Sequence, residues 1–170
     1  MITSPARCAC GAFFYMGESI PATISIGGKL PNRLVDEFEK LLDSNSDGFS
    51  NTDPRNNPCG SFELTNDQAY NGEFEDLEAF CRKNQLTYVR KSDAKYDFEA
   101  EYICWQPGME SPKIIAGSQN SGPVVTLKML IAAKEDGNTL DEVIADNTPI
   151  DVPDFAIVND DEVPEVASVS

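Results

Sequence analysis

The sequence predicts an α+β domain with a mostly antiparallel mixed sheet, helices packed on one face, and an acidic C-terminal tail. Two observations predict this class. Short β-branched runs bounded by turn residues occur along the chain together with amphipathic segments at helical spacing. The 170 residues are 41% hydrophobic and 25% charged, which is ordinary for one globular domain.

Four elements are expected in the first half of the chain. The run 21–27 is β-branched and closed by two glycines, which predicts a strand. Apolar side chains recur at helical spacing over 31–43, after a proline that suits a first helical turn. A strand is expected over 61–65. A helix over 73–84 has its acids early and its bases late, as the helix dipole favours.

The second of these helices has a clear apolar side. Its core-facing residues are expected to be Phe74, Leu77, Phe80 and Cys81. Its acids, Glu78 included, are expected to face solvent.

The second half is expected to hold three strands and two helices. The strands are predicted over 86–90, 94–105 and 113–117. A helix is predicted over 124–135, and the pattern Thr139-x-x-Glu142 is typical of a capping box that begins another.

The chain is expected to divide into an N-terminal arm over 1–20, one domain over 21–147 and an acidic extended tail over 148–170. The arm has no cleavage pattern typical of a secretory signal. No run approaches the roughly 18 apolar residues of a membrane span, so no membrane partner is expected. The tail is rich in proline and acid, which favours mobility unless its one apolar run, 155–158, docks as an edge strand.

The five cysteines are expected to be free thiols in a reducing, cytoplasmic compartment. Their odd number argues against a disulfide framework, and their spacing and the absence of histidine argue against zinc. No metal and no other cofactor is expected. Cys81 and Cys104 are predicted in the core, and Cys8, Cys10 and Cys59 in loops or the arm.

Charge is the strongest global feature, with 29 acids against 13 bases and a formal net charge of −16. Residues 135–170 contain eleven acids and no lysine or arginine. Such a chain repels nucleic acid and anionic membranes. The expected partner is therefore a basic protein surface, a nucleic-acid-binding protein among the candidates.

The loop after the first predicted helix resembles half of an EF-hand calcium loop. Asp43, Asn45, Asp47 and the following glycine match its first half, but position 12 is Pro54 and Asp53 falls one step early. An ordinary polar loop has the same residue types. No tight calcium site is expected there.

The stretch 96–105 alternates cleanly between two faces. One face, expected to point into the core, holds Tyr96, Phe98, Ala100, Tyr102 and Cys104. The other carries Asp97, Glu99 and Glu101 and ends in Trp105, and these four are the candidate binding residues. The simplest interpretation is a solvated strand face.

The functional interpretation is an anionic stripe whose spacing of roughly 6.6 Å is close to that of phosphates along a DNA strand. The main hypothesis is therefore a non-enzymatic acidic protein that binds a basic protein surface. Its most concrete version is an inhibitor that mimics nucleic acid, of the type used in phage or mobile-element counter-defence.

Two alternatives remain open. Without histidine, the usual Ser-His and Cys-His nucleophile systems are excluded. A carboxylate enzyme using Glu99 and Glu101 is not excluded, with Trp105 and Tyr102 near enough in sequence to suggest a sugar platform. A structural or assembly protein is the third possibility. A concave pocket holding Glu99 or Glu101 with a raised pKa would favour the enzyme, and a convex acidic ridge would favour the mimic.

Overall fold

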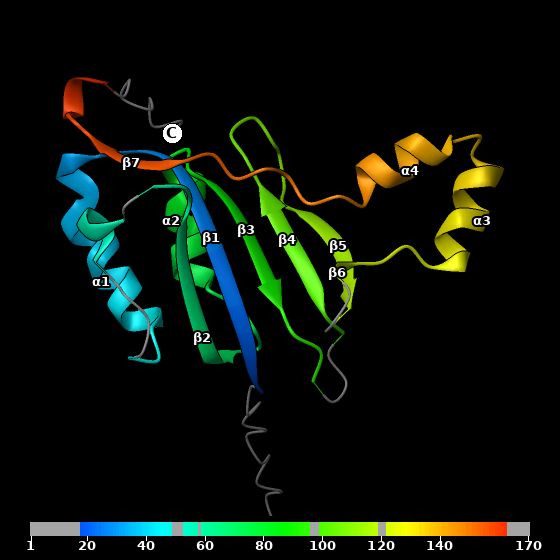
Figure 1. Ribbon diagram of the computed structural model, residues 1–170, viewed down its shortest axis with the longest axis horizontal. Coiled ribbons are helices and arrows are strands. Elements are labelled where there is room, and N and C mark those ends of the chain that lie inside the picture. Colours follow the sequence, from blue (N-terminus) through cyan, green and yellow to red (C-terminus); the bar gives the residue numbers. More distant parts are fainter. Residues whose placement is uncertain (1–17, 49–52, 58, 96–98, 119–121, 163–170) are drawn as a thin grey trace, which may run out of the picture.

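The computed structural model describes residues 18–48, 53–57, 59–95, 99–118 and 122–162. They form a seven-stranded sheet with four helices, which confirms the predicted α+β class (Figure 1). The strands are β1 (Ser19–Pro31), β2 (Phe62–Tyr70), β3 (Thr87–Ser92), β4 (Glu101–Trp105), β5 (Lys113–Ser118), β6 (Gly122–Pro123) and β7 (Phe155–Val158). The helices are α1 (Val35–Asn45), α2 (Glu75–Lys83), α3 (Leu127–Glu135) and α4 (Leu140–Asp146), with short 3-10 turns at Asn32–Leu34, Pro54–Asn56 and Asp160–Glu162.

The sheet order is β2-β1-β3-β4-β5-β6, and each of these neighbours is antiparallel. β7 is the exception, because it pairs in parallel with the last residues of β1. β1 and β2 both extend well beyond the predicted runs, since they pair with each other along most of their length. Their register shifts between Ile20 and Ala22, where Pro21 has no N–H to contribute to the ladder.

The main core lies between the sheet and the pair of helices α1 and α2. Four phenylalanines from four different elements meet there. The ring of Phe38 on α1 lies 5.8 Å from Phe62, 5.5 Å from Phe80 and 5.6 Å from Phe155. All four are buried. The prediction of helices on one face of the sheet is therefore confirmed by α1 and α2.

The segment between α4 and β7 runs across the sheet on the face opposite α2 (Figure 1). It crosses β1 at Gly27, where an added Cβ would lie 1.9 Å from the Pro153 carbonyl oxygen. Two backbone bonds then fix β7, from Gly28 N to Asp154 O at 3.1 Å and from Phe155 N to Gly60 O at 2.9 Å. The apolar run of the tail thus docks as a strand, and residues 163–170 lie outside the described residues.

The helices α3 and α4 lie beyond the β5–β6 side of the sheet rather than on either face (Figure 1). The Lys113 ammonium holds the end of α4, donating to the carbonyls of Ala145 and Thr148 at 3.0 and 3.3 Å. The predicted capping box is confirmed, since Thr139 and Glu142 bond each other reciprocally. Among the described residues, no helix is both long and apolar enough to span a membrane.

Two predicted orientations are wrong. Glu78 on α2 is buried rather than exposed, and it faces the sheet. On β4, Ile103 and Trp105 belong to the helix-covered core, although the sequence assigned them to the solvent face. The reason is that both faces of β4 are covered at this end of the strand, since Ile103 and Trp105 pack in the core and Cys104 on the opposite face is buried as well.

Candidate functional site

The anionic stripe predicted from the sequence is only partly a surface feature. Asp97 lies outside the described residues. Trp105 is buried, stacks on Tyr88 at 6.4 Å and donates from Nε1 to the Met109 carbonyl at 3.2 Å. It is therefore a core residue and is not available as a sugar platform. Glu99 and Glu101 do share one region of the surface.

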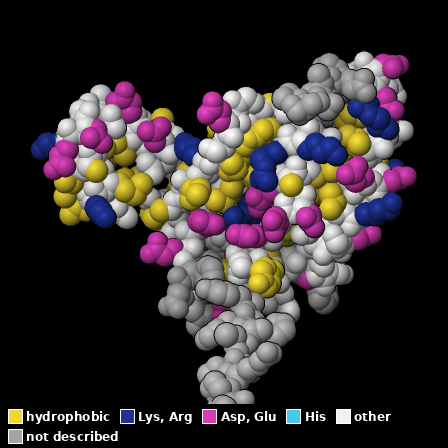
Figure 2. Space-filling view, turned by 180° about the vertical axis from the view of Figure 1, so that it is seen from behind, with side chains coloured by type: hydrophobic (Ala, Val, Ile, Leu, Met, Phe, Trp, Pro, Cys, Tyr) yellow, Lys and Arg dark blue, Asp and Glu magenta, His cyan; other side chains and the backbone are white. Residues whose placement is uncertain are grey.

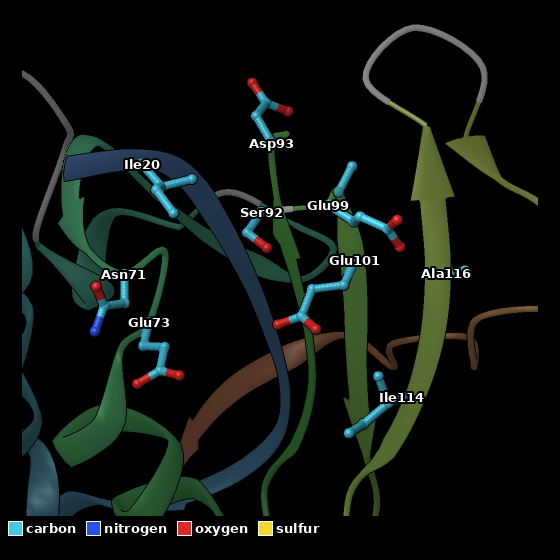
Figure 3. A pocket seen from close by; sticks show the side chains of 10 residues that line it. Ile20, Asn71, Glu73, Ser92, Asp93, Glu99, Glu101, Ile114 and Ala116 are labelled. Carbon is cyan, nitrogen blue, oxygen red and sulfur yellow. The ribbon is translucent and has the colours of Figure 1, made fainter. Parts of the chain in front are cut away.

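That region is a hollow of about 450 Å³ on the face that carries α2 (Figure 3). The side chains of β4 and β5 form one side of it, and the turn between β2 and α2 forms the other. The lining residues are Ile20, Asn71, Glu73, Ser92, Asp93, Glu99, Ala100, Glu101, Ile114 and Ala116. Four of these described lining residues are acids and none is a lysine or arginine.

The turn that positions Glu73 is a tight one. Asn71 and Gly72 both have positive φ, 52° and 71°, which reverses the chain directly after β2. A side chain at Gly72 would also meet the Ser92 Cβ at 2.8 Å. The turn therefore packs against β3, and Figure 3 shows Glu73 lining the same hollow as Glu101.

Arg90 on β3 lies beside the hollow and is buried, with only 5% of its side chain exposed. Its Nε lies 2.8 Å from Glu78 Oε1, and its Nη2 donates to Glu101 Oε1 at 3.2 Å. Its Nη1 donates to the Gly72 carbonyl. Two carboxylates and a carbonyl thus compensate the guanidinium, as a buried charge requires.

The network continues from Glu78 to the end of α2. The Tyr88 hydroxyl donates to Glu78 Oε2 at 3.3 Å and accepts from Arg82 Nη1 at 2.8 Å. Burial, together with the nearby Glu78 charge, raises the pKa of Tyr88 to about 12. Arg82 and Arg90 therefore bind groups inside the domain and stabilise its structure.

The acids of the hollow differ in how they are held. Glu101 is 36% exposed and paired with Arg90, and Asp93 lies 3.9 Å from Lys91. Glu73 and Glu99 are exposed, and neither side chain bonds to another described residue. These two carboxylates are available to a ligand.

The chemistry of the lining suits a cation with an apolar stem. Ile20, Ile114 and Ala116 supply apolar surface next to the carboxylates. Lysine and arginine side chains bury their methylene groups along such surface and keep the charged end near anionic groups. The lining is therefore chemically suited to one basic side chain or an organic amine.

The candidate calcium loop is held by local contacts. Asp47 Oδ2 accepts from Asp67 N at 3.4 Å, Asp53 Oδ1 from Arg55 N at 2.9 Å, and the Asn45 amide donates to the Leu41 carbonyl. In the part of the chain that the structure describes, no three acids or cysteines gather as a metal cluster would require. The expectation that this loop holds no tight calcium site stays a prediction, because residues 49–52 lie outside that part.

The described cysteines follow the predicted pattern. Cys59 is exposed, whereas Cys81 and Cys104 are buried, and all three are free. Burial raises the pKa of both buried thiols. Cys8 and Cys10 lie outside the described residues.

Sequence reasoning missed Glu73, Asp93 and the buried Arg90. One signal was available for Arg90, because the strand period of two places it on the same face as Tyr88 and opposite Ile24 of β1. No comparable signal exists for Glu73, which reaches the hollow only through the fold of its turn.

The chain matches no known family model, no curated protein and no solved structure. The fold and the site define its class by themselves: an acidic α+β protein with a carboxylate-lined hollow beside a buried arginine network.

Proposed function

We propose that this protein is a non-enzymatic acidic binding protein whose hollow receives a lysine or arginine side chain from a basic protein surface. The observation that carries the proposal is the hollow itself. Four carboxylates line it, and two of them, Glu73 and Glu99, are exposed and bonded to no other described residue. The chain charge of −16 would draw a cationic partner toward it.

The concave shape favours capture of single basic side chains over mimicry of nucleic acid. A mimic would present its carboxylates as a projecting row, whereas Glu99 and Glu101 line a hollow. The two residues that continue their face along β4, Ile103 and Trp105, are buried.

Binding is also favoured over carboxylate catalysis and over assembly. Glycosidases need two carboxyl groups facing the substrate, whereas Glu101 binds the buried guanidinium of Arg90. A concave site by itself would suit an enzyme, so turnover is one outcome that the test below must include. Self-assembly would bring two strongly negative copies together, and their charges repel.

The test is an NMR titration with a small cation, the methylamide of N-acetyl-lysine. We expect amide shifts that saturate together and cluster at Glu73, Ser92, Glu99 and Ile114. The variant Glu73→Ser/Glu99→Ser should lose these shifts, because it lacks the two exposed carboxylates. Its fold should persist, because both replaced residues are exposed. Glu37→Ser/Asp151→Ser removes the same charge from exposed positions outside the hollow and should keep them.

Two results would contradict the proposal. Shifts spread evenly over exposed acids would show that net charge alone attracts the cation. Hydrolysis of aryl glycosides by the wild type, lost in Glu99→Gln, would instead show that the hollow is catalytic.

A further inference from the structure

α3 is apolar on nearly all sides, yet it packs against little. Its sequence, LKMLIAAKE, contains only three polar residues. A helix of this composition is normally buried. Here no residue of α3 is buried, and the side chains of Leu127 and Ile131 are 73% and 51% exposed.

α4 also has exposed apolar side chains, on a surface that neighbours α3. Its Val143 is buried, but Leu140 and Ile144, one helical turn apart, are exposed, Leu140 by 64%. We call the exposed apolar set on the two helices the apolar helix surface. It consists of Leu127, Leu130, Ile131, Leu140 and Ile144. Figure 2 shows apolar side chains among acidic ones on this lobe, at the left of the view.

Without a partner, α3 lacks the packing contacts that normally stabilise a short helix. Helices shorter than about 12–15 residues are marginal in water, and most of their stability in proteins comes from packing an apolar face. α3 has nine residues and no buried face. A partner that covers the apolar helix surface would supply the missing contacts.

The charges around the surface determine what kind of partner fits. Residues 127–146 contain five acids and two lysines: Glu135, Asp136, Asp141, Glu142, Asp146, Lys128 and Lys134. A second copy would place the same acids against them, with −16 on each chain. Anionic lipid would be repelled in the same way. A cationic partner would be attracted.

We propose that the apolar helix surface docks an amphipathic helix of a partner protein, with an apolar stripe facing α3 and α4 and lysine or arginine on its flanks. Grooves that take such helices use apolar anchors at i, i+3, i+4 and i+7. The inference stands on α3 and α4 alone, and it holds whether or not the acidic hollow binds a basic side chain.

The test uses two synthetic peptides of about 18 leucine and lysine residues, near the length at which an isolated helix forms. One places leucine at i, i+3, i+4 and i+7, and the other has the same composition scrambled. Fluorescence anisotropy at about 0.15 M salt limits binding by charge alone. The wild type should bind the amphipathic peptide about tenfold tighter or more, since only that peptide presents a continuous apolar stripe.

Four variants show which surface causes the preference for the amphipathic peptide. Leu127→Ser/Ile131→Ser should abolish it, and Leu140→Ser/Ile144→Ser should weaken it, with both folds retained because these side chains are exposed. The matched control Tyr70→Ser removes an exposed apolar side chain from β2 and should leave it unchanged. Glu73→Ser/Glu99→Ser should also leave it unchanged, so failure of the hollow and failure of this surface give different results.

Four results would overturn the inference. Equal affinity for the two peptides would show attraction by charge alone, and an unaltered preference in both α3 and α4 variants would place binding elsewhere. Sedimentation showing a dimer that Leu127→Ser/Ile131→Ser dissociates would make a second copy the occupant. Flotation with phosphatidylcholine vesicles, lost in the same variant, would make it a lipid surface.

Discussion

Arg90 is the residue on which the interior around the hollow most depends. A buried guanidinium is tolerated only when carboxylates and acceptors surround it. Glu78 and Glu101 supply the carboxylates and Gly72 supplies a carbonyl. The surface hollow therefore lies beside a buried, charge-compensated network.

Glu78→Ala should destabilise the domain by about 3 to 5 kcal/mol, because it leaves the Arg90 charge buried with one carboxylate fewer. Glu75→Ala on the same helix is the control, and its exposed position predicts a loss under about 1 kcal/mol. Urea unfolding of both variants measures the difference. A Glu78→Ala loss no larger than that of Glu75→Ala would contradict the role given to the network.

Glu101 is the less buried of the two carboxylates that bind Arg90. Its replacement should therefore lower the free energy of unfolding by less than the replacement of Glu78. Glu101→Gln keeps the shape of the side chain and should lose about 1 kcal/mol or less, since a partly exposed ion pair contributes little. Together with the Glu78 variant it ranks the two carboxylates, again by urea unfolding. A larger loss for Glu101→Gln than for Glu78→Ala would reverse their roles.

The stability of the protein should fall at alkaline pH. Burial raises the pKa of Tyr88 to about 12, whereas an unfolded tyrosine titrates near 10. A neutral phenol is thus favoured by the fold, so this contribution is complete below about pH 10 and is lost as the pH rises through the folded value. The buried thiol of Cys81, whose pKa is also raised, acts in the same direction.

Urea midpoints at pH 8 and about 10.5 test the direction of this change, because the stabilisation from the neutral Tyr88 phenol begins to disappear between these two pH values. The wild type should lose more stability than Tyr88→Phe over that interval. A decline equally steep in Tyr88→Phe would show that other groups cause it.

The Phe155 side chain anchors β7 to the core, in addition to the backbone pairing of β7 with β1. Phe155 stacks on Phe38 and lies 5.7 Å from Phe62. Phe155→Ala should cost about 3 to 5 kcal/mol, the range for a buried phenylalanine, whereas Ala156→Ser at the next, exposed position should be nearly neutral. Hydrogen exchange at Gly28 should accelerate in the first variant only. Unchanged protection there would mean that β7 is not held by this ring.

Local patterns predicted most helices and strands but not their partners. Helical spacing and capping residues place α1, α2 and α4 correctly, because those signals lie within a few residues. The pairing of β7 with β1 joins segments more than a hundred residues apart, and a four-residue apolar run carries no mark of its partner. The exposure of α3 could not be predicted from the sequence either, since its composition is that of a buried helix.

The candidate site was predictable in part. Alternation along 99–105 correctly placed Glu99 and Glu101 together, because the period of a strand is local. It could not show that both faces of β4 are covered near Trp105, so it wrongly predicts Trp105 on the surface. Glu73 and Arg90 join the site through the turn at Gly72 and the register of β3, which depend on long-range packing.

Charge governs how the whole molecule would meet a partner. Acids are spread over most of the described surface, and Figure 2 shows several of them across the face that carries α2. Ions screen exposed charges within roughly 8 Å at physiological strength. Association with a basic partner should therefore weaken steeply with salt, by a slower approach of the two proteins as well as a faster dissociation.

The central claim is that the hollow, and not the net charge, selects a basic side chain. The direct measurement is biolayer interferometry against an immobilised peptide of isolated lysines, over about 0.05 to 0.5 M salt. Wild type and Glu37→Ser/Asp151→Ser should bind alike, while Glu73→Ser/Glu99→Ser should bind about fivefold or more weakly at the low-salt end, as the loss of about 1 kcal/mol predicts. Identical binding by the two double variants would contradict the claim.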